Sequence, residues 1–447
     1  MVLPAIVVFG LWISRSLRQF VPFAPAECAE FEIRTAASQR HRVGAGFGDA
    51  SGCRGSAPMR RTFAAPGSLN GVSDTREAVM LRRALLFACV GVMAAGAAAA
   101  ETTRTLRAQL SGDPAAPFVV ENLAGAMTVV AGNGDAVVAV ATVHADDAAL
   151  ADAMRFEQVR DENGVPVLRV IYPLDRERTI RYEARDEGHH HGRGHHGLEW
   201  LFGSWDGTEV KYDGHRVRVS SSSGARLWAD IEVQVPRRAV SATFKNHVGA
   251  LSANGIEGRI LLDTGRGGIT ARRLKGEIKA DTGSGEVLAE EITGSFSCDT
   301  GSGECNVTGF DGTELSCDTG SGPVHIRRVK ADLIVADTGS GRITVEQADA
   351  GEFRGDTGSG GIDAELTGAR LRRVKADTGS GHVSLRLPAD ASFEVFADQG
   401  SGSLSCGFAD ATAVKSDHKV VGYRRGDGKV RIAIDTGSGG ATVNPAR

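Results

Sequence analysis

The residues in this sequence that could do chemistry are first of all aspartates, which recur in the pentapeptide Asp-Thr-Gly-Ser-Gly. Two such segments that converge in a cleft can share a proton and activate a water, as in aspartic proteases. Here the motif or a close variant recurs every 18 to 21 residues, with one gap of 37, starting at Asp263, Asp281, Asp299, Asp318, Asp337, Asp356, Asp377, Asp398 and Asp435. A line of motifs does not make one catalytic pair, so we expect no protease.

Two structural interpretations of the aspartates remain. In the preferred one, each carboxylate accepts hydrogen bonds from turn N–H groups as an Asx-type corner. In the other, calcium relieves the repulsion within a ladder of carboxylates about 4.8 Å apart. Calcium-binding β-rolls use a shorter repeat that is richer in aspartate. We therefore expect no cofactor and keep calcium as the lesser alternative.

A second group of candidate metal ligands is a histidine run: His189, His190, His191, His195 and His196. Imidazoles at this density could hold zinc, copper or nickel. Glycines separate the histidines, so we interpret residues 188–197 as a solvated loop. Weak metal binding is the alternative.

Three basic clusters share a pattern of two arginines, an apolar residue and a lysine. The apolar residue is predicted to point inward and the charges toward solvent. Such a surface ordinarily keeps strands soluble, and the alternative is binding to phosphate or carboxylate groups of envelope polymers. The clusters are Arg272, Arg273 and Lys275; Arg327, Arg328 and Lys330; and Arg372, Arg373 and Lys375.

The cysteines include no CxxC pair, which excludes the usual zinc-ribbon and thioredoxin-type sites. Cys298 and Cys317 occupy the same position in adjacent repeats, within disulfide range if the repeats stack. Parallel side chains in register are poorly aimed for that bond, so buried thiols are preferred and a disulfide is the alternative. No Ser-His-Asp or Cys-His grouping is readable, and we expect no enzyme.

Short strands must position these residues. Side chains three and one before each aspartate, and six and eight after it, are apolar or small, as at Ile278, Ala280, Val287 and Ala289. This period of two predicts strands on both sides of a turn. We predict an all-β, single-chain β-solenoid with rungs of 18 to 21 residues and short parallel strands. The glycine-rich corners, such as Gly283 with Gly285 and Gly301 with Gly303, are expected to supply positive φ. One rung is expected to have lost its motif near Asp417.

The remainder of the chain divides by composition. Residues 80–100 have a basic start, an apolar stretch and the small residues Ala98-Ala99-Ala100, which together predict a signal peptide cleaved near Ala100. Translation from Met80 would make residues 1–79 a mis-called or disordered upstream extension, and a membrane anchor in the first apolar run is the competing interpretation. Residues 101–245 are predicted to be a degenerate β region with a helix over 146–159, and residues 246–445 the regular array.

The run Gly125-Ala126-Met127-Thr128-Val129-Val130, residues 230–236 and the repeated motif together resemble the putative-adhesin family of exported bacterial β-solenoids, a domain of unknown function. The resemblance covers roughly residues 115–445 and implies a fold and export more than an activity. A net charge of −4 gives no general attraction to nucleic acid, which we do not expect as a partner.

We expect a non-enzymatic, adhesin-like structural or interaction module in the periplasm or at the cell surface. Its expected partner is an envelope polysaccharide or a surface protein, with no transmembrane span after Glu101. The sequence leaves the oligomeric state open. A carbohydrate-active enzyme on a β-helix scaffold is the alternative, and a metal- or calcium-binding envelope protein is a lesser one.

Overall fold

The computed structural model describes residues 101–183, 207–416 and 418–446. All of them belong to one compact unit, Gly91–Arg447. The predicted upstream extension, the signal peptide and the histidine run lie outside these residues. Within the described part, no helix is long and apolar enough to span a membrane.

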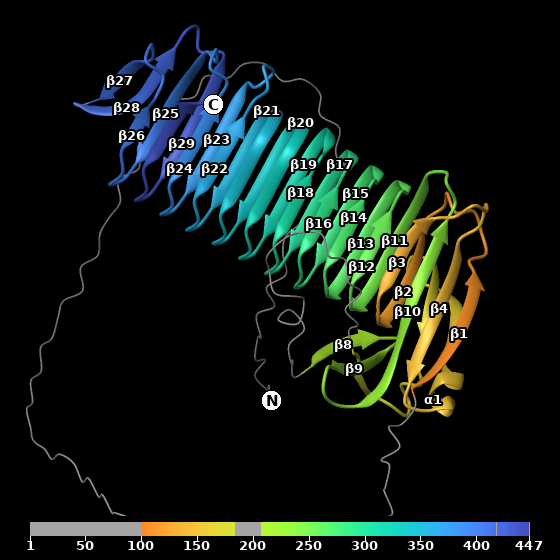
Figure 1. Ribbon diagram of the computed structural model, residues 1–447. Helices are drawn as coiled ribbons and strands as arrows, with labels where there is room; N and C mark the ends of the chain where they lie inside the picture. The colour runs from red at the N-terminus through yellow and green to blue at the C-terminus, as the bar shows by residue number, and fades with distance from the viewer. Residues whose placement is uncertain (1–100, 184–206, 417, 447) are drawn as a thin grey trace, which may run out of the picture. The chain divides into compact units, whose positions relative to one another are not determined.

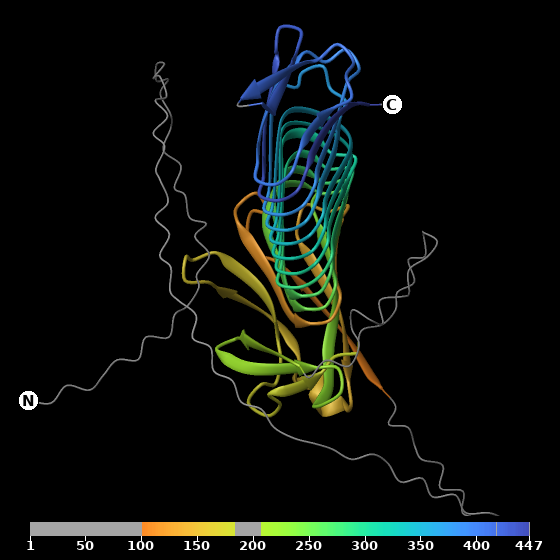
Figure 2. The same ribbon diagram turned by 90° about the vertical axis from the view of Figure 1, so that its left-hand side faces the viewer.

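Two columns of parallel strands build an all-β solenoid, and its rungs lie one behind the next in Figure 2. The leading column carries the strands that run into the motif. In spatial order it contains β2 (Phe118–Ala124), β11 (Val240–Val248), β13 (Glu257–Arg266), β15 (Lys275–Thr282), β17 (Thr293–Thr300), β19 (Asp311–Thr319), the second halves of β20 (Val324–Thr338) and β21 (Ile343–Thr357), β23 (Arg373–Thr378), β29 (Val430–Thr436) and β25 (Phe393–Gln399).

The following column carries the strands that leave the motif. It contains β3 (Met127–Ala131), β12 (Leu251–Asn254), β14 (Ile269–Arg272), β16 (Val287–Glu290), β18 (Cys305–Thr308), the first halves of β20 and β21, β22 (Ile362–Leu366), β24 (Val383–Leu387), β30 (Ala441–Pro445) and β26 (Leu404–Cys406).

The predicted apolar columns form the core between the two strand columns. Ile278, Ala280, Val287 and Ala289 are each no more than 2% exposed, and the equivalent residues of the other rungs are also buried. Cys406 on β26 departs from this pattern because it is half-buried. The period-two pattern therefore predicted the inward face correctly.

Threonine closes the motif corner. The Thr338 hydroxyl donates to the carbonyl oxygen of Gly322 in the preceding rung (2.9 Å) and accepts from the N–H of Gly341 in its own (3.0 Å). The same pair of bonds recurs at Thr319, Thr357 and Thr378. Each hydroxyl is buried, so it satisfies two backbone groups that water cannot reach.

The corner glycines are needed for close approach, and the prediction that they supply positive φ is wrong. Gly283, Gly285, Gly301 and Gly303 are not among the residues with positive φ. A Cβ on Gly303 would lie 1.7 Å from the carbonyl oxygen of Gly285, and one on Gly301 would lie 2.4 Å from that of Gly283. Any side chain there would push adjacent rungs apart.

Left-handed backbone occurs instead at the second corner, where each following strand ends. Arg273, Glu291, Arg328 and Gln347 have φ between 50° and 56° at that corner. The third corner lies at the start of each leading strand. Gly276 there has a φ of 121°, and Gly258 and Gly294, its equivalents in the adjacent rungs, also have positive φ. One residue is inserted there from β19 onward, which shifts the register and allows Ala331 to replace the glycine. This insertion accounts for the change in spacing from 18 to 19 residues.

At the N-terminal end, β2 and β3 form a rung that stacks on β11 and β12, as predicted for a degenerate repeat. Each column extends by one more parallel strand, because β6 (Pro166–Ile171) pairs with β2 and β10 (Ala225–Val235) pairs with β3. Beyond them the pairing is antiparallel: β1 (Thr102–Gln109) and β10 both pair with β4 (Val138–Ala145). The remaining elements are α1 (Ala148–Ala153), β5 (Arg155–Arg160), β7 (Thr179–Arg181), β8 (Thr208–Tyr212) and β9 (His215–Ser220). The predicted helix is thus shorter than expected, because Arg155 already begins a strand paired with β6.

At the C-terminal end, the last rung in sequence is not the last in space. Strands β29 and β30 insert between the rung of β23 and β24 and the rung of β25 and β26. Figure 1 shows β29 between β25 and β23. The prediction of a degenerate rung near Asp417 is wrong. Asp417 itself lies outside the described residues, but β27 (Thr412–Ser416) and β28 (Lys419–Arg425) on either side of it form an antiparallel hairpin, and β28 covers the outer edge of β25.

We predict that Thr338→Val lowers the stability of the protein by about 1–3 kcal/mol, because it leaves two buried backbone groups unpaired while the side-chain shape is retained. Urea denaturation followed by circular dichroism measures this loss. Thr344→Val is the matched control. Thr344 is a half-buried threonine near the start of β21, in the following column and outside the motif corner. Equal effects of the two substitutions would contradict the role of the corner hydroxyl.

Candidate functional site

The motif aspartates form an outward-facing ladder. In spatial order, Asp263, Asp281, Asp299, Asp318, Asp337, Asp356, Asp377, Asp435 and Asp398 lie in register. Within the described residues no turn N–H donates to these carboxylates, so the Asx-type interpretation is wrong. The threonine that follows each aspartate makes the corner bonds instead.

Charge within the ladder is only partly neutralised. Lys245 precedes Asp263 in the ladder and pairs with it at 3.0 Å, and Lys279 pairs with Asp281 at 3.1 Å. Burial, and then the adjacent aspartates, raise the pKa of Asp299 and Asp337. Across residues 101–183, 207–416 and 418–446, no three His, Cys, Asp or Glu side chains are grouped so as to hold a metal ion.

Three cysteines lie in the core. Cys298, Cys305 and Cys317 are each no more than 1% exposed, and all three are free thiols. Cys298 and Cys317 are neighbours in the leading column, as their spacing predicted. Burial raises the pKa of the Cys305 thiol. The structure agrees with the preferred interpretation of buried thiols.

A buried ionic network lies at the N-terminal end. The Glu121 carboxylate contacts Arg169 Nε at 2.7 Å and His247 Nε2 at 2.9 Å. Burial acts to raise the pKa of Glu121, but the bonds from His247 and Arg169 outweigh it and the pKa is lowered. These residues come from β6, β2 and β11, so the network joins three adjacent parallel strands at this end. Arg169 Nη1 also contacts the Asp213 carboxylate at 2.9 Å, so one guanidinium joins two carboxylates.

The basic clusters separate into two kinds. In the first two, Leu274 and Val329 point inward as expected, and several of the charges are paired across rungs. The pairs are Arg272 with Glu290 (2.7 Å), Lys275 with Glu257 (3.3 Å) and Arg327 with Glu346 (2.8 Å). Arg273 and Arg328 occupy the left-handed second corner, a conformation that arginine does not favour. Lys330 is exposed in β20, outside these pairs.

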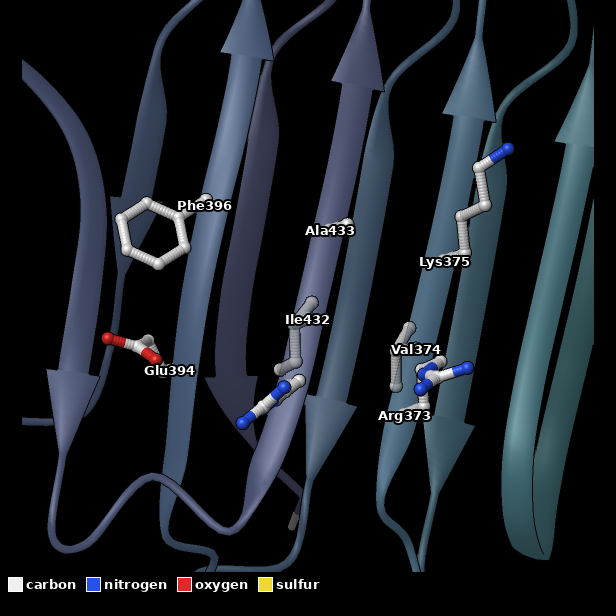
Figure 3. Close-up of a pocket in the computed structure, with 8 residues that line it drawn as sticks. Arg373, Val374, Lys375, Glu394, Phe396, Ile432 and Ala433 are labelled. Carbon is white, nitrogen blue, oxygen red and sulfur yellow. The ribbon is translucent and has the colours of Figure 1, made fainter. Parts of the chain in front are cut away.

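The third cluster is different because it opens onto a depression of about 420 Å³ on the leading column. Arg373 and Lys375 lie on β23, Ala433 on β29, and Glu394 and Phe396 on β25, as Figure 3 shows. We call this depression the Phe396 notch and define it by Phe396, Ala433, Lys375, Glu394, Arg431 and Arg373. Arg372 lies beside it at the start of the strand. The buried Val374 and Ile432 form its floor.

Register explains the shape of the notch. One outward row runs Phe396, Ala433, Lys375, and the next runs Glu394, Arg431, Arg373. The small Ala433 side chain leaves a gap between a ring and a long cation. Phe396 is 48% exposed and is the one exposed large hydrophobic side chain in the described part of the chain.

Cations in the notch are weakly neutralised. Arg373 lies 3.9 Å from Glu352, which makes a closer contact of 2.7 Å with Arg354. Among the described residues, Lys375 and Arg431 make no ion pair within 4.0 Å. The notch therefore holds three cations and one carboxylate. The ladder aspartates Asp398, Asp435 and Asp377 form the next outward row on the same strands, and the charge of Lys375 acts against the raised pKa of Asp435.

Sequence reasoning found Arg373 and Lys375 but missed Phe396, Arg431 and Glu394. The insertion of β29 brings Arg431 beside Arg373, and no local pattern announces it. One signal was available: two residues before the motif aspartate, the other rungs carry aliphatic, small or cationic residues, whereas Phe396 alone is aromatic.

Comparison with known families agrees with this architecture. Residues 229–444, from β10 to β30, match the family model Toastrack DUF4097. This part of the chain is similar to the Toastrack family. The family resemblance seen in the sequence is thereby confirmed, and the Phe396 notch lies within the matched residues. No curated protein matches the chain.

Several solved structures share a distant likeness to the chain, each over 77% of its length. One is described as a putative cell adhesion protein from Clostridium sporogenes, with 10% identity, a TM-score of 0.18 and 100% of that chain covered. Another is described as a putative lipid binding protein from Parabacteroides distasonis, with 14% identity, a TM-score of 0.34 and 97% of that chain covered. A third is described as a putative adhesin from Parabacteroides merdae, with 11% identity, a TM-score of 0.31 and 96% of that chain covered.

We predict that Asp337→Asn stabilises the protein at pH 7 by about 0.5 kcal/mol, because it removes a like-charge contact between adjacent strands. The raised pKa of Asp337 means that the folded state takes up this proton more readily than the unfolded chain. The penalty is present at neutral pH and fades as the pH falls through that raised pKa. The gain should therefore shrink between pH 7 and about pH 4.

Urea midpoints at several pH values measure this effect. Asp410→Asn is the control of opposite sign, since a hydrogen bond from Arg425 lowers the pKa of Asp410. A gain at Asp337 that does not depend on pH, or a loss of stability at pH 7, would contradict like-charge strain in the ladder.

Proposed function

We propose that this protein is an exported, non-enzymatic, adhesin-like module of the bacterial envelope that binds an anionic envelope polymer through the Phe396 notch. The observation that carries the proposal is the concentration of weakly neutralised cations beside an exposed aromatic ring. In the other two predicted clusters, three of the six basic residues, Arg272, Lys275 and Arg327, are paired with carboxylates of adjacent rungs. A locally cationic, partly apolar surface attracts polyanions even when the whole chain is acidic.

Export is supported by the position of the first strand. Strand β1 begins at Thr102, just after the predicted cleavage site near Ala100. Glu101 contacts the buried His144 Nδ1 at 2.5 Å, so a mature chain that starts at Glu101 keeps its first side chain anchored. We propose the domain boundaries of the sequence analysis on the same basis, with residues 101–245 leading into the array of residues 246–445.

An enzymatic role gains no support from the same surface. Glycoside hydrolysis ordinarily needs two carboxyl groups that flank the scissile bond. The notch holds one carboxylate, Glu394, and its neighbours in register are the cations Arg431 and Arg424. The surface is therefore better suited to holding an anion than to acid–base chemistry.

We predict that the triple substitution Arg373→Ala, Lys375→Ala and Arg431→Ala weakens binding of polygalacturonate and of polyphosphate by roughly tenfold or more. Each lost contact between exposed opposite charges is worth about 0.5–1 kcal/mol. Binding by the unaltered protein should fall steeply between low and high salt. Isothermal calorimetry or fluorescence anisotropy measures both effects.

The matched control removes the same three charges where they are already paired: Arg259→Ala, Lys275→Ala and Arg327→Ala. It should leave binding within about twofold of the unaltered protein, since the net charge changes equally in both variants. An equal loss in the control, or no binding of either polyanion at low salt, would overturn the proposed function.

A further inference from the structure

We infer that the Phe396 notch is a subsite for one uronic acid ring, a six-membered sugar that carries a carboxylate. The inference rests on the proposed function and specifies its ligand. It follows from three features of the notch that act together: the fixed aromatic ring, the gap over Ala433, and the arrangement of charges.

The ring of Phe396 is held in place from one side. It lies against Gly422 of β28, where a Cβ would be only 3.1 Å from the ring atom Cδ1. Strand β28 pairs antiparallel with β25, so Gly422 is directly opposite Phe396. The glycine admits the ring, and the remaining ring surface stays in solvent. A half-exposed aromatic side chain in this row marks a contact site better than it serves packing.

The gap beside the ring fits a single sugar. Phe396 and Lys375 are two strands apart, about 9–10 Å across the sheet, with Ala433 between them. In the same row of the other described rungs, Ser297 and Ser316 are also small, but they stand between Lys279 and Val335 and so beside no aromatic ring. The insertion of β29 is what places an alanine between the aromatic ring and the lysine.

The charges select for a carboxylate that also bears hydroxyl groups. Arg431 and Arg373 are adjacent in register and can pair with one ligand carboxylate. Glu394 lies next to Arg431 and can accept hydrogen bonds from ligand hydroxyls. A neutral sugar lacks the carboxylate, and polyphosphate has neither hydroxyls for Glu394 nor an apolar face for the ring.

The test compares oligogalacturonate, polyphosphate and a neutral maltooligosaccharide on the same purified variants. Phe396→Ala should weaken oligogalacturonate binding about tenfold and change polyphosphate binding less than twofold. Ala433→Leu fills the gap without altering charge, and it should also weaken oligogalacturonate selectively. Leu261→Ala, in the same row near the other end of the array, is the matched control and should change neither.

The outcomes separate this inference from the proposed function. One set of outcomes has both polyanions binding, with Phe396→Ala weakening the two equally, or with neither Phe396→Ala nor Ala433→Leu weakening either one. Each of these results would show that the uronate subsite is wrong while polyanion binding stands. If the maltooligosaccharide binds as tightly as oligogalacturonate, the selection for a carboxylate is wrong. If neither polyanion binds, both proposals fail. Melting temperatures of the variants confirm that each remains folded.

Discussion

The close approach of backbones at the motif corner is the constraint on which the rest of the structure depends. Two glycines per motif let each rung pass under the carbonyl oxygens of the rung before it, at distances that no side chain would allow. The buried threonine hydroxyl then joins the two rungs by accepting from one and donating to the other. With the corner fixed in this way, the apolar columns on both sides fall into register and form a continuous core.

Corner threonines bond to the preceding rung, as Thr338 does, so the rungs at the two ends of the stack need other hydrogen-bond partners. At the N-terminal end, Asn122 and Asn246 occupy the threonine position, and their side-chain amides bond to each other at 3.1 Å. At the C-terminal end, the motif variant carries Gln399, whose longer side chain reaches the carbonyl oxygen of Val420 on β28 at 2.8 Å. Departures from the motif thus occur where a rung meets a cap.

The sequence predicted the solenoid well because its information repeats. Each column of apolar residues is sampled once per rung, so the strand period and register are overdetermined. It could not show that Thr338, and not Asp337, makes the corner bonds, because the aspartate recurs in all nine motifs and the threonine in eight of them. Nor could it place left-handed backbone at Arg273 and Arg328, whose residue types favour no such conformation.

The candidate site was predicted only in part, for a topological reason. Arg373 and Lys375 are close in sequence, and their clustering was visible. Phe396 and Arg431 join them because the strand order in space differs from the order in sequence. Strand β29, which follows β25 and the hairpin in sequence, lies between β23 and β25 in the sheet. Consecutive repeats suggest consecutive stacking, so a sequence argument has no means of anticipating this order. The surface consequence is that an aromatic residue, an alanine and a lysine become neighbours.

The measurement that tests the corner constraint most directly is amide hydrogen exchange after Gly341→Ala, a substitution whose Cβ would lie 1.9 Å from the carbonyl oxygen of Gly322. We predict loss of protection at the corners of the rungs that carry Asp318, Asp337 and Asp356, with the distant rung of Asp263 nearly unchanged. Exchange at those three corners equal to that of the unaltered protein would contradict the account.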